Sequence, residues 1–438
     1  MNPLRGRQIV VSSEELKNYP TNEYQHREAM ILNQQLYCQR CNALIIRQEN
    51  VLPNGVFFCS ECQEFGRIRS DSYLVSVRGQ GGEKEERSVN FTWQGKLTQL
   101  QTHIAQQLQK NYQAKQSTLL WAVTGSGKTE MVFPVIYLVL LKGGRVCMTS
   151  PRIDVCRELY PRIVAAFQEE QVLLLYGNSK EKYRYSNLTI CTTHQMLHFY
   201  QAFDLIIVDE IDAFPYEGNS VLQFALKNAL NPHGRLIYLT ATPPNHLLQE
   251  VQQTFAIEKS PLRFHQRPLI VPECIWYNHW EQASHSRFHF KKFHRMILEL
   301  LKDNHVLVFC PSIQFMNRLA KQTQTYFIEG QVASVNSTDP LREEKVQKMR
   351  EKKYQVLFST TILERGVTFE DLSVIVMGAN HPVYTKSALV QIAGRVDRKG
   401  EYRRGRVIFF HNQKTIGMRQ ACREIKEMNQ LAKGWLSK

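Results

Sequence analysis

The chain has 438 residues, enough for two to four domains with hydrophobic cores of their own. Lys and Arg (55) outnumber Asp and Glu (40), and the net charge of +15 favours a polyanionic partner, with nucleic acid first, over a merely basic surface. No run of 18 apolar residues occurs and residues 1–10 lack the apolar core of a signal peptide, so we expect a cytoplasmic protein that does not span a membrane. A peripheral position on a membrane complex stays open.

The ten cysteines of a cytosolic chain indicate metal ligation or buried thiols and argue against a disulfide framework. Cys38 and Cys41 form one CxxC pair, and Cys59 and Cys62 form a second pair 17 residues later. This spacing predicts a four-thiolate Zn2+ site, and because four thiolates leave no coordination position for water, the site should be structural. The other cysteines show no such spacing and mostly sit in apolar runs typical of cores: Cys147, Cys156, Cys191, Cys274, Cys310 and Cys422.

The N-terminal region, residues 1–88, is polar and irregular, with short helical patterns near residues 14–19 and 25–36. The zinc module occupies about residues 36–66. A Gly-rich and then charged stretch, residues 79–87, has linker composition and marks the first domain boundary. Basic side chains in or beside the CxxC pairs suggest a nucleic-acid contact: Arg40, Arg47, Arg67 and Arg69.

A phosphate-binding loop follows in residues 122–129, between an apolar strand at 118–122 and a core helix at 131–141. Small residues let backbone N–H groups approach phosphate, a lysine pairs with the β and γ phosphates of ATP, and a hydroxyl binds Mg2+. The predicted nucleotide-binding residues are Thr124, Gly125, Ser126, Gly127, Lys128 and Thr129. Ala122 stands where the strict pattern has glycine, and a Gly-rich turn without ligand is the alternative interpretation.

Strands and helices alternate from residue 89 to residue 256, which predicts a parallel sheet with helices on both faces. Ligands of such sheets gather at the carboxyl ends of the strands. Asp209 and Glu210 directly follow an apolar strand, so we expect Asp209 to hold Mg2+ and Glu210 to orient and deprotonate an attacking water. The segment 240–242 (Thr-Ala-Thr) ends the next strand.

Residues 257–287 have the composition of a connector with some hairpin character, whose aromatic and basic side chains either stack on bases or pack onto neighbours. A second α/β block spans residues 288–438. We expect Gln391, Arg395 and Arg398 to share a helix, with both arginines on one face and able to reach the γ-phosphate. An ordinary basic helix face is the alternative.

These motifs, in this order over about residues 95–412, resemble those of superfamily 2 helicases and translocases: AxxGxGKT, DEID, TAT, TT…ERG and QxxGRxxR. The resemblance implies two RecA-like domains and ATP hydrolysis, with Gln101 reading the adenine and Gly366 and Gln391 at the nucleotide. It also implies grips on a nucleic-acid backbone at residues 150–152, 192–195, 311–312 and 360–361.

The four-cysteine module together with residues 208–215 and 361–369 is similar to the narrower ComFA family of late competence ATPases. That resemblance implies ATP-driven handling of incoming single-stranded DNA at the inner face of the cell membrane. It also implies a ComFC-like partner, the membrane DNA-uptake channel as a neighbour, and ring-like homo-oligomers.

Three alternatives stay open at this point. One is a helicase of the primosomal-restart kind, whose cysteine cluster however lies inside the second lobe, and another is an RNA helicase. The third is a DNA-binding scaffold whose ATPase acts only as a clamp.

Overall fold

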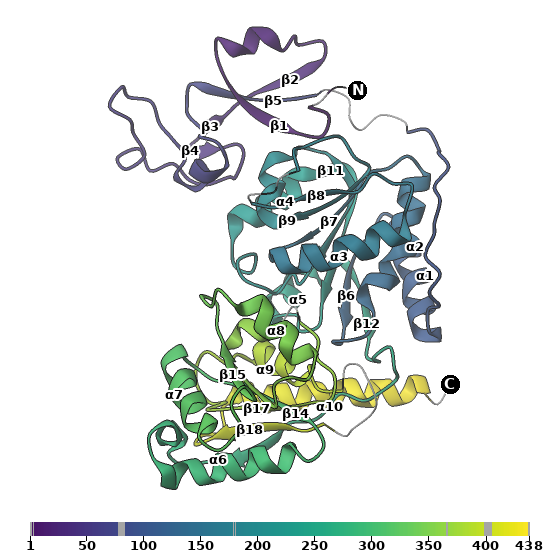
Figure 1. Ribbon diagram of the computed structural model, residues 1–438. Helices are drawn as coiled ribbons and strands as arrows, with labels where there is room; N and C mark the ends of the chain where they lie inside the picture. The colour runs from purple at the N-terminus through teal and green to yellow at the C-terminus, as the bar shows by residue number, and fades with distance from the viewer. Residues whose placement is uncertain are drawn as a thin grey trace. The chain divides into compact units, whose positions relative to one another are not determined.

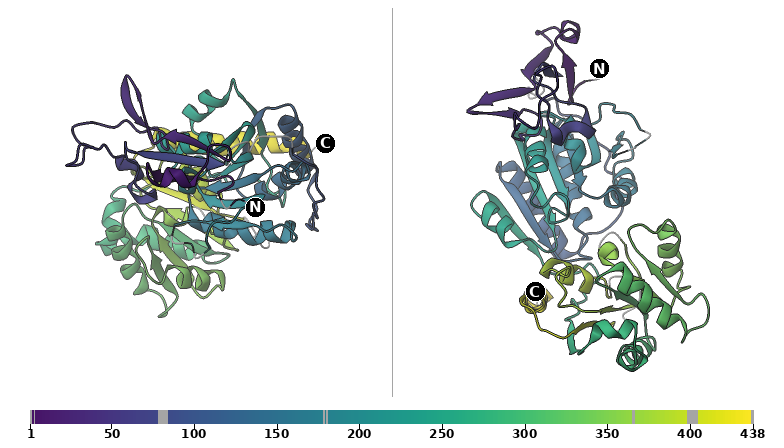
Figure 2. Two further views of the ribbon diagram at one scale, coloured as in Figure 1. Left: turned by 90° about the horizontal axis from the view of Figure 1, so that it is seen from above. Right: turned by 90° about the vertical axis from the view of Figure 1, so that its left-hand side faces the viewer.

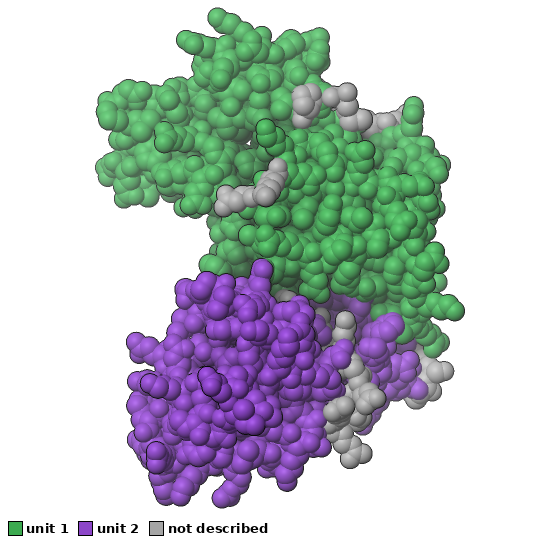
Figure 3. Space-filling model, viewed as in Figure 1, with its two compact units in different colours: residues 1–121, 129–240, 245–258 green, residues 122–128, 241–244, 259–438 purple. Residues whose placement is uncertain are grey.

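The computed structural model describes residues 2, 4–77, 84–177, 179, 181–364, 367–397 and 405–436. The chain divides into two compact units, which Figure 3 colours separately. Unit 1 consists of residues 1–121, 129–240 and 245–258, and unit 2 of residues 122–128, 241–244 and 259–438. Part of the stretch expected to be a linker, residues 79–83, lies outside the described residues.

Unit 1 begins with an antiparallel sheet in the order β1-β5-β2, shown in purple in Figures 1 and 2. Its strands are β1 (Gln8–Ser12), β2 (Tyr24–Glu28) and β5 (Ser72–Val77). A hairpin of β3 (Met30–Asn33) and β4 (Gln35–Cys38) then carries the chain to the first cysteine. The 3-10 helix η2 (Ser60–Phe65) follows Cys59.

The helix expected at residues 25–36 is wrong, because β2, β3 and β4 occupy this segment. Gln34 has a φ of +59°, which reverses the chain between β3 and β4. Pairing of β2 with β5, about 50 residues later in the sequence, outweighs the local helical pattern. At residues 14–19 the expected helix is a single 3-10 turn, η1 (Glu15–Asn18).

The first parallel sheet has seven strands in the order β12-β6-β11-β10-β7-β9-β8. The strands are β6 (Ser117–Ala122), β7 (Val146–Ser150), β8 (Leu173–Leu175), β9 (Leu188–Thr192), β10 (Phe203–Asp209), β11 (Leu230–Thr240) and β12 (Phe255–Ser260). The helices are α1 (Gln99–Gln113), α2 (Lys128–Leu141), α3 (Ile153–Ala166), η3 (Thr193–His198), α4 (Ser220–Ala229) and α5 (Asn245–Val251). Helix α3 packs on β7 and β9, helix α4 packs on β11, and helices lie on either side of the sheet in the right-hand view of Figure 2.

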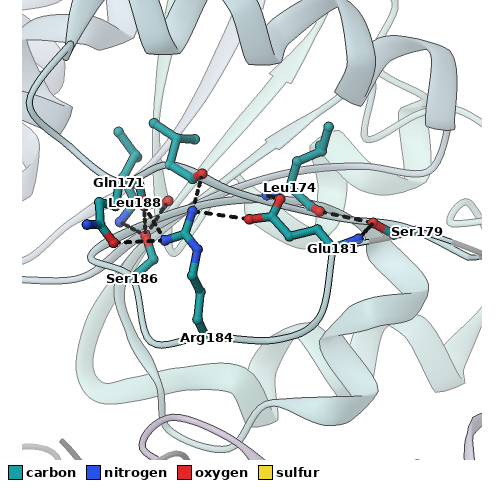
Figure 4. A network of polar contacts seen from close by, with 8 residues as sticks. Gln171, Leu174, Ser179, Glu181, Arg184, Ser186 and Leu188 are labelled. Carbon is teal, nitrogen blue, oxygen red and sulfur yellow. Dashed lines mark hydrogen bonds and ion pairs between the residues drawn. The ribbon is translucent and has the colours of Figure 1, made fainter.

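The segment between β8 and β9 is held to the sheet by a polar network around Arg184 (Figure 4). The Arg184 guanidinium donates to the carbonyl oxygens of Gln171 (3.1 Å) and Val172 (3.0 Å) and pairs with Glu181 (3.1 Å). Ser186 Oγ donates to Gln171 O at 2.6 Å. On the edge strand β8 itself, Leu174 N donates to Glu181 Oε2 at 3.3 Å, so the same network also pairs part of the edge backbone.

Unit 2 is built on a six-stranded parallel sheet in the order β13-β18-β17-β14-β16-β15. The strands are β13 (Glu273–Trp276), β14 (His305–Phe309), β15 (Val332–Val335), β16 (Val356–Ser359), β17 (Leu372–Val376) and β18 (Val407–His411). The helices are η4 (Trp280–Ser284), α6 (Arg287–Leu300), α7 (Ile313–Gln324), α8 (Arg342–Arg350), η5 (Thr361–Leu363), α9 (Lys386–Ala393) and α10 (Ile416–Leu436). Two parallel sheets preceded by a small cysteine-bearing module confirm the predicted α/β fold class.

The hairpin suggested for residues 257–287 is wrong. Strand β12 joins the first sheet and β13 joins the second, so the two strands do not pair with each other. Tyr277 and Trp280 are buried in the core of unit 2, whereas Trp276 is exposed. Packing therefore accounts for the first two aromatic residues.

Within the described part of the chain, no helix combines the length and the apolar character needed to cross a membrane.

Candidate nucleotide site and metal centre

The nucleotide-site residues of the first sheet stand at the carboxyl ends of neighbouring strands. Trp121 of β6 pairs with Thr240 of β11, and Asp209 of β10 pairs with Leu239 of β11. Because these strands are parallel, the loops that leave them emerge at one edge of the sheet. The strand that leads into the predicted phosphate loop and the strand that leads into the acidic residues therefore end at the same edge of the sheet.

The phosphate loop is a tight turn between β6 and α2. Ser126 N donates to Val123 O at 3.2 Å, and Gly125 and Gly127 have φ values of +78° and +76°. A side chain at either glycine would be strained, so the turn needs these residues. Helix α2 begins at Lys128 and buries Thr129 in its first turn. Glycine-rich backbone that leads into a helix N-terminus is the geometry that binds phosphate.

The acidic motif is ordered by its own backbone and by the next strand. Asp209 is buried, and its Oδ1 accepts from the N–H of Glu210 at 3.0 Å. Glu210 has a φ of +57°, and its Oε2 lies 3.8 Å from Nε of Arg152. Asp212 accepts from Thr240 Oγ1 at 2.7 Å, which ties the motif to the Thr-Ala-Thr segment. Two adjacent carboxylates at the end of a parallel strand fit Mg2+ binding and water activation.

Inside unit 2, Gln391 of α9 is buried, and its Nε2 donates to Thr242 Oγ1 at 3.2 Å. Thr242 Oγ1 also lies 2.7 Å from Ser387 Oγ. Thr124 Oγ1 donates to Gly394 O at 3.2 Å. A Cβ at Gly394 would lie 2.1 Å from that hydroxyl oxygen, so glycine is required for the approach. Two of the residues predicted to bind nucleotide, Thr124 and Gln391, are therefore each held by a hydrogen bond within this unit.

The expectation that Arg395 lies on a helix face is wrong. Helix α9 ends at Ala393, Gly394 is its C-cap, and Arg395 lies in the turn that follows. Arg395 is buried, and its Nε donates to Glu364 O at 3.1 Å. The backbone tightens after Ala393, because Arg395 N donates to Ile392 O at 3.1 Å, three residues back. The α-helix therefore ends before the arginine, which the spacing of three in the sequence does not reveal. Arg398 and Gly366 lie outside the described residues.

Gln101, the residue predicted to read the adenine, closes a capping box at the start of α1. Its side-chain oxygen accepts from Thr98 N at 2.8 Å, and its own N–H donates to Thr98 Oγ1 at 3.3 Å. The amide nitrogen of the same side chain is a separate hydrogen-bond donor. Capping and adenine recognition can therefore be tested separately.

Gln101→Glu should keep the cap, because a carboxylate also accepts from Thr98 N and is favourable at a helix N-terminus. It replaces the amide donor, so we expect KM for ATP to rise on the order of fivefold to tenfold. Gln101→Ala should raise KM and also destabilise the fold by about 1 kcal/mol. The exposed Gln106→Glu on the same helix is the matched control. An unchanged KM in both Gln101 variants would contradict adenine recognition.

The four cysteines of the two CxxC pairs are buried together, and their sulfur atoms all lie within 4.8 Å of one another. The Sγ atoms of Cys38 and Cys62 are 3.9 Å apart, and those of Cys41 and Cys59 are 3.5 Å apart. Zn–S bonds of 2.3 Å in a regular tetrahedron place sulfur atoms about 3.8 Å apart. The cluster therefore fits Zn2+ in size and in donor type, whereas an octahedral oxygen-binding ion would not suit it.

Arg40 lies against this cluster and is nearly inaccessible to solvent, so the nucleic-acid contact suggested for it is wrong. Its Nε donates to Cys62 Sγ at 3.3 Å, and its other nitrogens donate to Phe65 O (2.8 Å) and Cys62 O (3.1 Å). Hydrogen bonds from the neighbouring thiols, together with the Arg40 charge, hold the pKa of Cys62 below its usual value. Arg40 thus balances thiolate charge, as groups around bound metals commonly do.

The module packs onto the first parallel sheet through η3. Gln8 Nε2 donates to Leu197 O (3.0 Å) and Phe199 O (3.2 Å), and Phe65 stacks on His194 with 5.8 Å between ring centroids. Burial, with Arg7 and Arg40 nearby, lowers the pKa of His198 to about 4, so this imidazole is neutral at pH 7. The stacking of Phe65 on His194 therefore brings the four-cysteine module against the predicted segment 192–195, which runs from the end of β9 into η3.

The sequence did not predict the contacts that two arginines, Arg152 and Arg263, make in the structure. Arg152 was assigned only to a backbone-gripping motif, yet its Nε lies 3.8 Å from Oε2 of Glu210. Arg263 is buried and donates to the carbonyl oxygens of Val396 (2.6 Å) and Gly394 (3.2 Å), which hold the turn after α9. The sequence grouped Arg263 with the other basic residues of the segment 257–287 and gave no signal for these contacts.

Comparison with known proteins adds to this geometry. The DEAD/DEAH box helicase family matches residues 98–251, and the helicase conserved C-terminal domain matches residues 289–400. Competence protein ComFA of Streptococcus pneumoniae is 40% identical over 399 residues, which covers 91% of each chain. ComFA of Bacillus subtilis is 38% identical over 433 residues, 97% of this chain and 93% of that protein. The chain belongs to the ComFA family.

As a ComFA-family protein with both helicase domains, the chain is a helicase-like ATPase. Solved structures show the same fold at low identity. Yeast (S. cerevisiae) Dbp5 bound to RNA and ADP BeF3 is 15% identical with a TM-score of 0.55, over 76% of this chain and 92% of that one. Lhr of Mycobacterium smegmatis bound to ssDNA and AMP-PNP is 16% identical with a TM-score of 0.54, over 77% and 50%.

Proposed function

We propose that this ComFA-family chain is an ATP-driven single-stranded DNA translocase that works in DNA uptake during natural competence. The proposal rests on one observation above all. The strands that lead into the phosphate loop and into Asp209 and Glu210 end at one sheet edge, in a chain that aligns with competence proteins over more than nine tenths of its length.

The chain's own residues divide the work of hydrolysis among them. Lys128 and the loop amides bind the β and γ phosphates, while Thr129 and Asp209 hold Mg2+. Glu210 orients the attacking water and takes its proton, with Arg152 beside it to position the carboxylate. Arg395 and Arg398 stabilise charge on the transferring phosphate. Mg2+ bound at this site would neutralise part of the negative charge on the phosphates.

Hydrolysis coupled to domain closure would shift the grip on one DNA strand. Candidate grips are the loops that follow β7, β9, β14 and β16, each at the carboxyl end of a parallel strand. Their side chains include hydroxyl groups as well as Arg152 and His194, and together with backbone N–H groups these suit phosphate contacts, which do not read bases. The resemblance to the family extends this proposal to three further points. They are a ComFC-like partner, the membrane DNA-uptake channel as a neighbour, and ring-like homo-oligomers at the inner face of the membrane.

Backbone gripping predicts that binding to single-stranded DNA depends steeply on salt. With about four phosphate contacts, affinity should fall on the order of tenfold to a hundredfold between 50 and 200 mM salt. Fluorescence anisotropy with labelled oligonucleotides of different base composition measures both the slope and the base preference, which we expect to be small. A flat salt dependence would refute backbone gripping.

ATPase stimulation separates the candidate polymers. Single-stranded DNA should stimulate hydrolysis more than RNA or blunt duplex DNA of equal nucleotide concentration. Stronger stimulation by RNA would favour an RNA helicase. Hydrolysis with no movement along DNA, measured by displacement of streptavidin from biotinylated oligonucleotides, would favour an ATP-gated clamp.

A further inference from the structure

Two cysteines far apart in the sequence meet in unit 2 outside the nucleotide site. Cys274 lies on β13, the edge strand of the sheet, and Cys422 lies on α10. Their Sγ atoms are 4.0 Å apart, although 148 positions separate the two residues. A disulfide needs sulfur atoms about 2.05 Å apart, so small side-chain rotations must bring the two sulfurs closer by about 2 Å.

The surroundings of this pair favour a reactive thiolate. Both cysteines are partly exposed, so a small solute reaches them. The hydrogen bond from Cys422, with the charges of Lys414 and Lys426, lowers the pKa of Cys274 to about 7. Much of this thiol is then ionised at neutral pH, and the thiolate is the nucleophile in sulfur chemistry. Cys422 keeps its proton, since its pKa is raised by its partner.

A second pair provides the contrast. Cys147 on β7 and Cys191 on β9 have Sγ atoms 3.6 Å apart, closer than the first pair. Both are completely buried, and burial raises the pKa of Cys191 well above its usual value. Short distance alone therefore does not make a reactive pair, because this pair lacks access and ionisation.

We propose that Cys274 and Cys422 form a reversible disulfide site that is oxidised by hydrogen peroxide or a related hydroperoxide. The Cys274 thiolate attacks one peroxide oxygen, the O–O bond breaks, and hydroxide leaves to become water, which produces a sulfenic acid. The Cys422 sulfur then attacks the Cys274 sulfur, the S–O bond breaks, and the hydroxide released takes the Cys422 proton. Two thiols lose two electrons and one peroxide becomes two waters. A dithiol reductant reverses the reaction.

The bond would fasten α10 to the edge of the sheet. Helix α10 already contacts α9 through the ion pair of Glu424 with Lys386 (2.6 Å). Its Asn429 side chain accepts from Leu269 N and donates to Leu269 O, each at 2.8 Å. A covalent link at Cys422 adds a third fixed point on the same helix. Because the closed loop is long, oxidation restricts the unfolded chain strongly and should stabilise unit 2.

The test uses the full-length, reduced, metal-loaded protein, treated with hydrogen peroxide and digested without reduction. Mass spectrometry should find the peptides of Cys274 and Cys422 joined, with the loss of two hydrogens, and dithiothreitol should release them. The Tm of the oxidised protein should rise by several degrees. In Cys422→Ser the link should vanish, and dimedone should label Cys274 as a sulfenic acid.

Cys147→Ser is the matched control, and it should leave the Cys274–Cys422 link intact. Peptides of Cys147 and Cys191 should stay unlinked in the wild-type protein. Two outcomes overturn the proposal. One is alkylation of both Cys274 and Cys422 after peroxide treatment that oxidises other cysteines. The other is sulfinic acid at Cys274 with no link.

Discussion

Lys128→Ala should lower the rate of ATP hydrolysis by on the order of a hundredfold to a thousandfold while single-stranded DNA binding persists. Lys128 begins α2 directly after the glycine turn, so its ammonium is the side-chain cation that this loop brings to the phosphates. DNA contacts assigned to the other strand-end loops do not involve this residue. Phosphate release with excess ATP and anisotropy with labelled DNA measure the two quantities.

Lys142→Ala is the matched control, because Lys142 is an exposed lysine just past the other end of the same helix. Its ATPase activity and Tm should equal those of the wild-type protein. If Lys128→Ala hydrolyses ATP at the wild-type rate, the loop is not the phosphate site.

Glu210→Gln distinguishes water activation from nucleotide binding. The amide keeps the size of the side chain but cannot accept a proton, so hydrolysis should fall about 10²-fold to 10⁴-fold. Binding of a fluorescent ATP analogue should change little, in contrast to Lys128→Ala. Equal losses of binding and hydrolysis in Glu210→Gln would contradict the role assigned to this carboxylate.

Removal of a zinc ligand has the second largest expected effect, on folding of the N-terminal module. Cys41→Ser should lose bound zinc and unfold the module, because metal binding contributes roughly 10 to 16 kcal/mol in zinc-finger peptides. The module core is continuous with that of the first sheet, through residues such as Ile45, Met196 and Phe199. Unfolding should therefore loosen η3 and weaken DNA binding as well.

Elemental analysis for zinc, limited trypsin digestion and thermal melting follow these changes. Cys422→Ser under reducing conditions is the control, since it removes a half-buried thiol outside the cluster and should keep one zinc per chain. Stoichiometric zinc and a wild-type melting curve in Cys41→Ser would contradict a four-thiolate site.

The sequence predicted the parallel sheets well because their strands are continuous apolar runs that end in distinctive polar motifs. Strand β10 is the clearest case, with five fully buried residues (203, 205–208) before Asp209. The spacing of the CxxC pairs likewise predicted the four cysteines that the fold brings together. Local patterns suffice where a few adjacent residues determine both the structure and the chemistry.

The sequence did not predict contacts between segments that lie far apart along the chain. The local sequence of β5 does not predict a strand, because the strand depends on pairing with β1 and β2. The pairing of β2 with β5 also explains why the segment expected to be a helix, residues 25–36, begins with a strand. Arg40 is basic and therefore suggested DNA, whereas burial against Cys62 shows a charge-balancing role. Cys274 and Cys422 have no recognisable spacing, since only the packing of α10 near β13 makes them a pair.

The strand order of the first sheet also bears on how the protein is made. Strand β12 is the last of the seven to be synthesised, yet it lies beside β6, the first. The sheet therefore stays open along β6 until residue 260 has left the ribosome, whereas the antiparallel β1-β5-β2 sheet is complete at residue 77. Domains generally fold as they emerge, so the cysteine module should be ready for metal well before the ATPase can form.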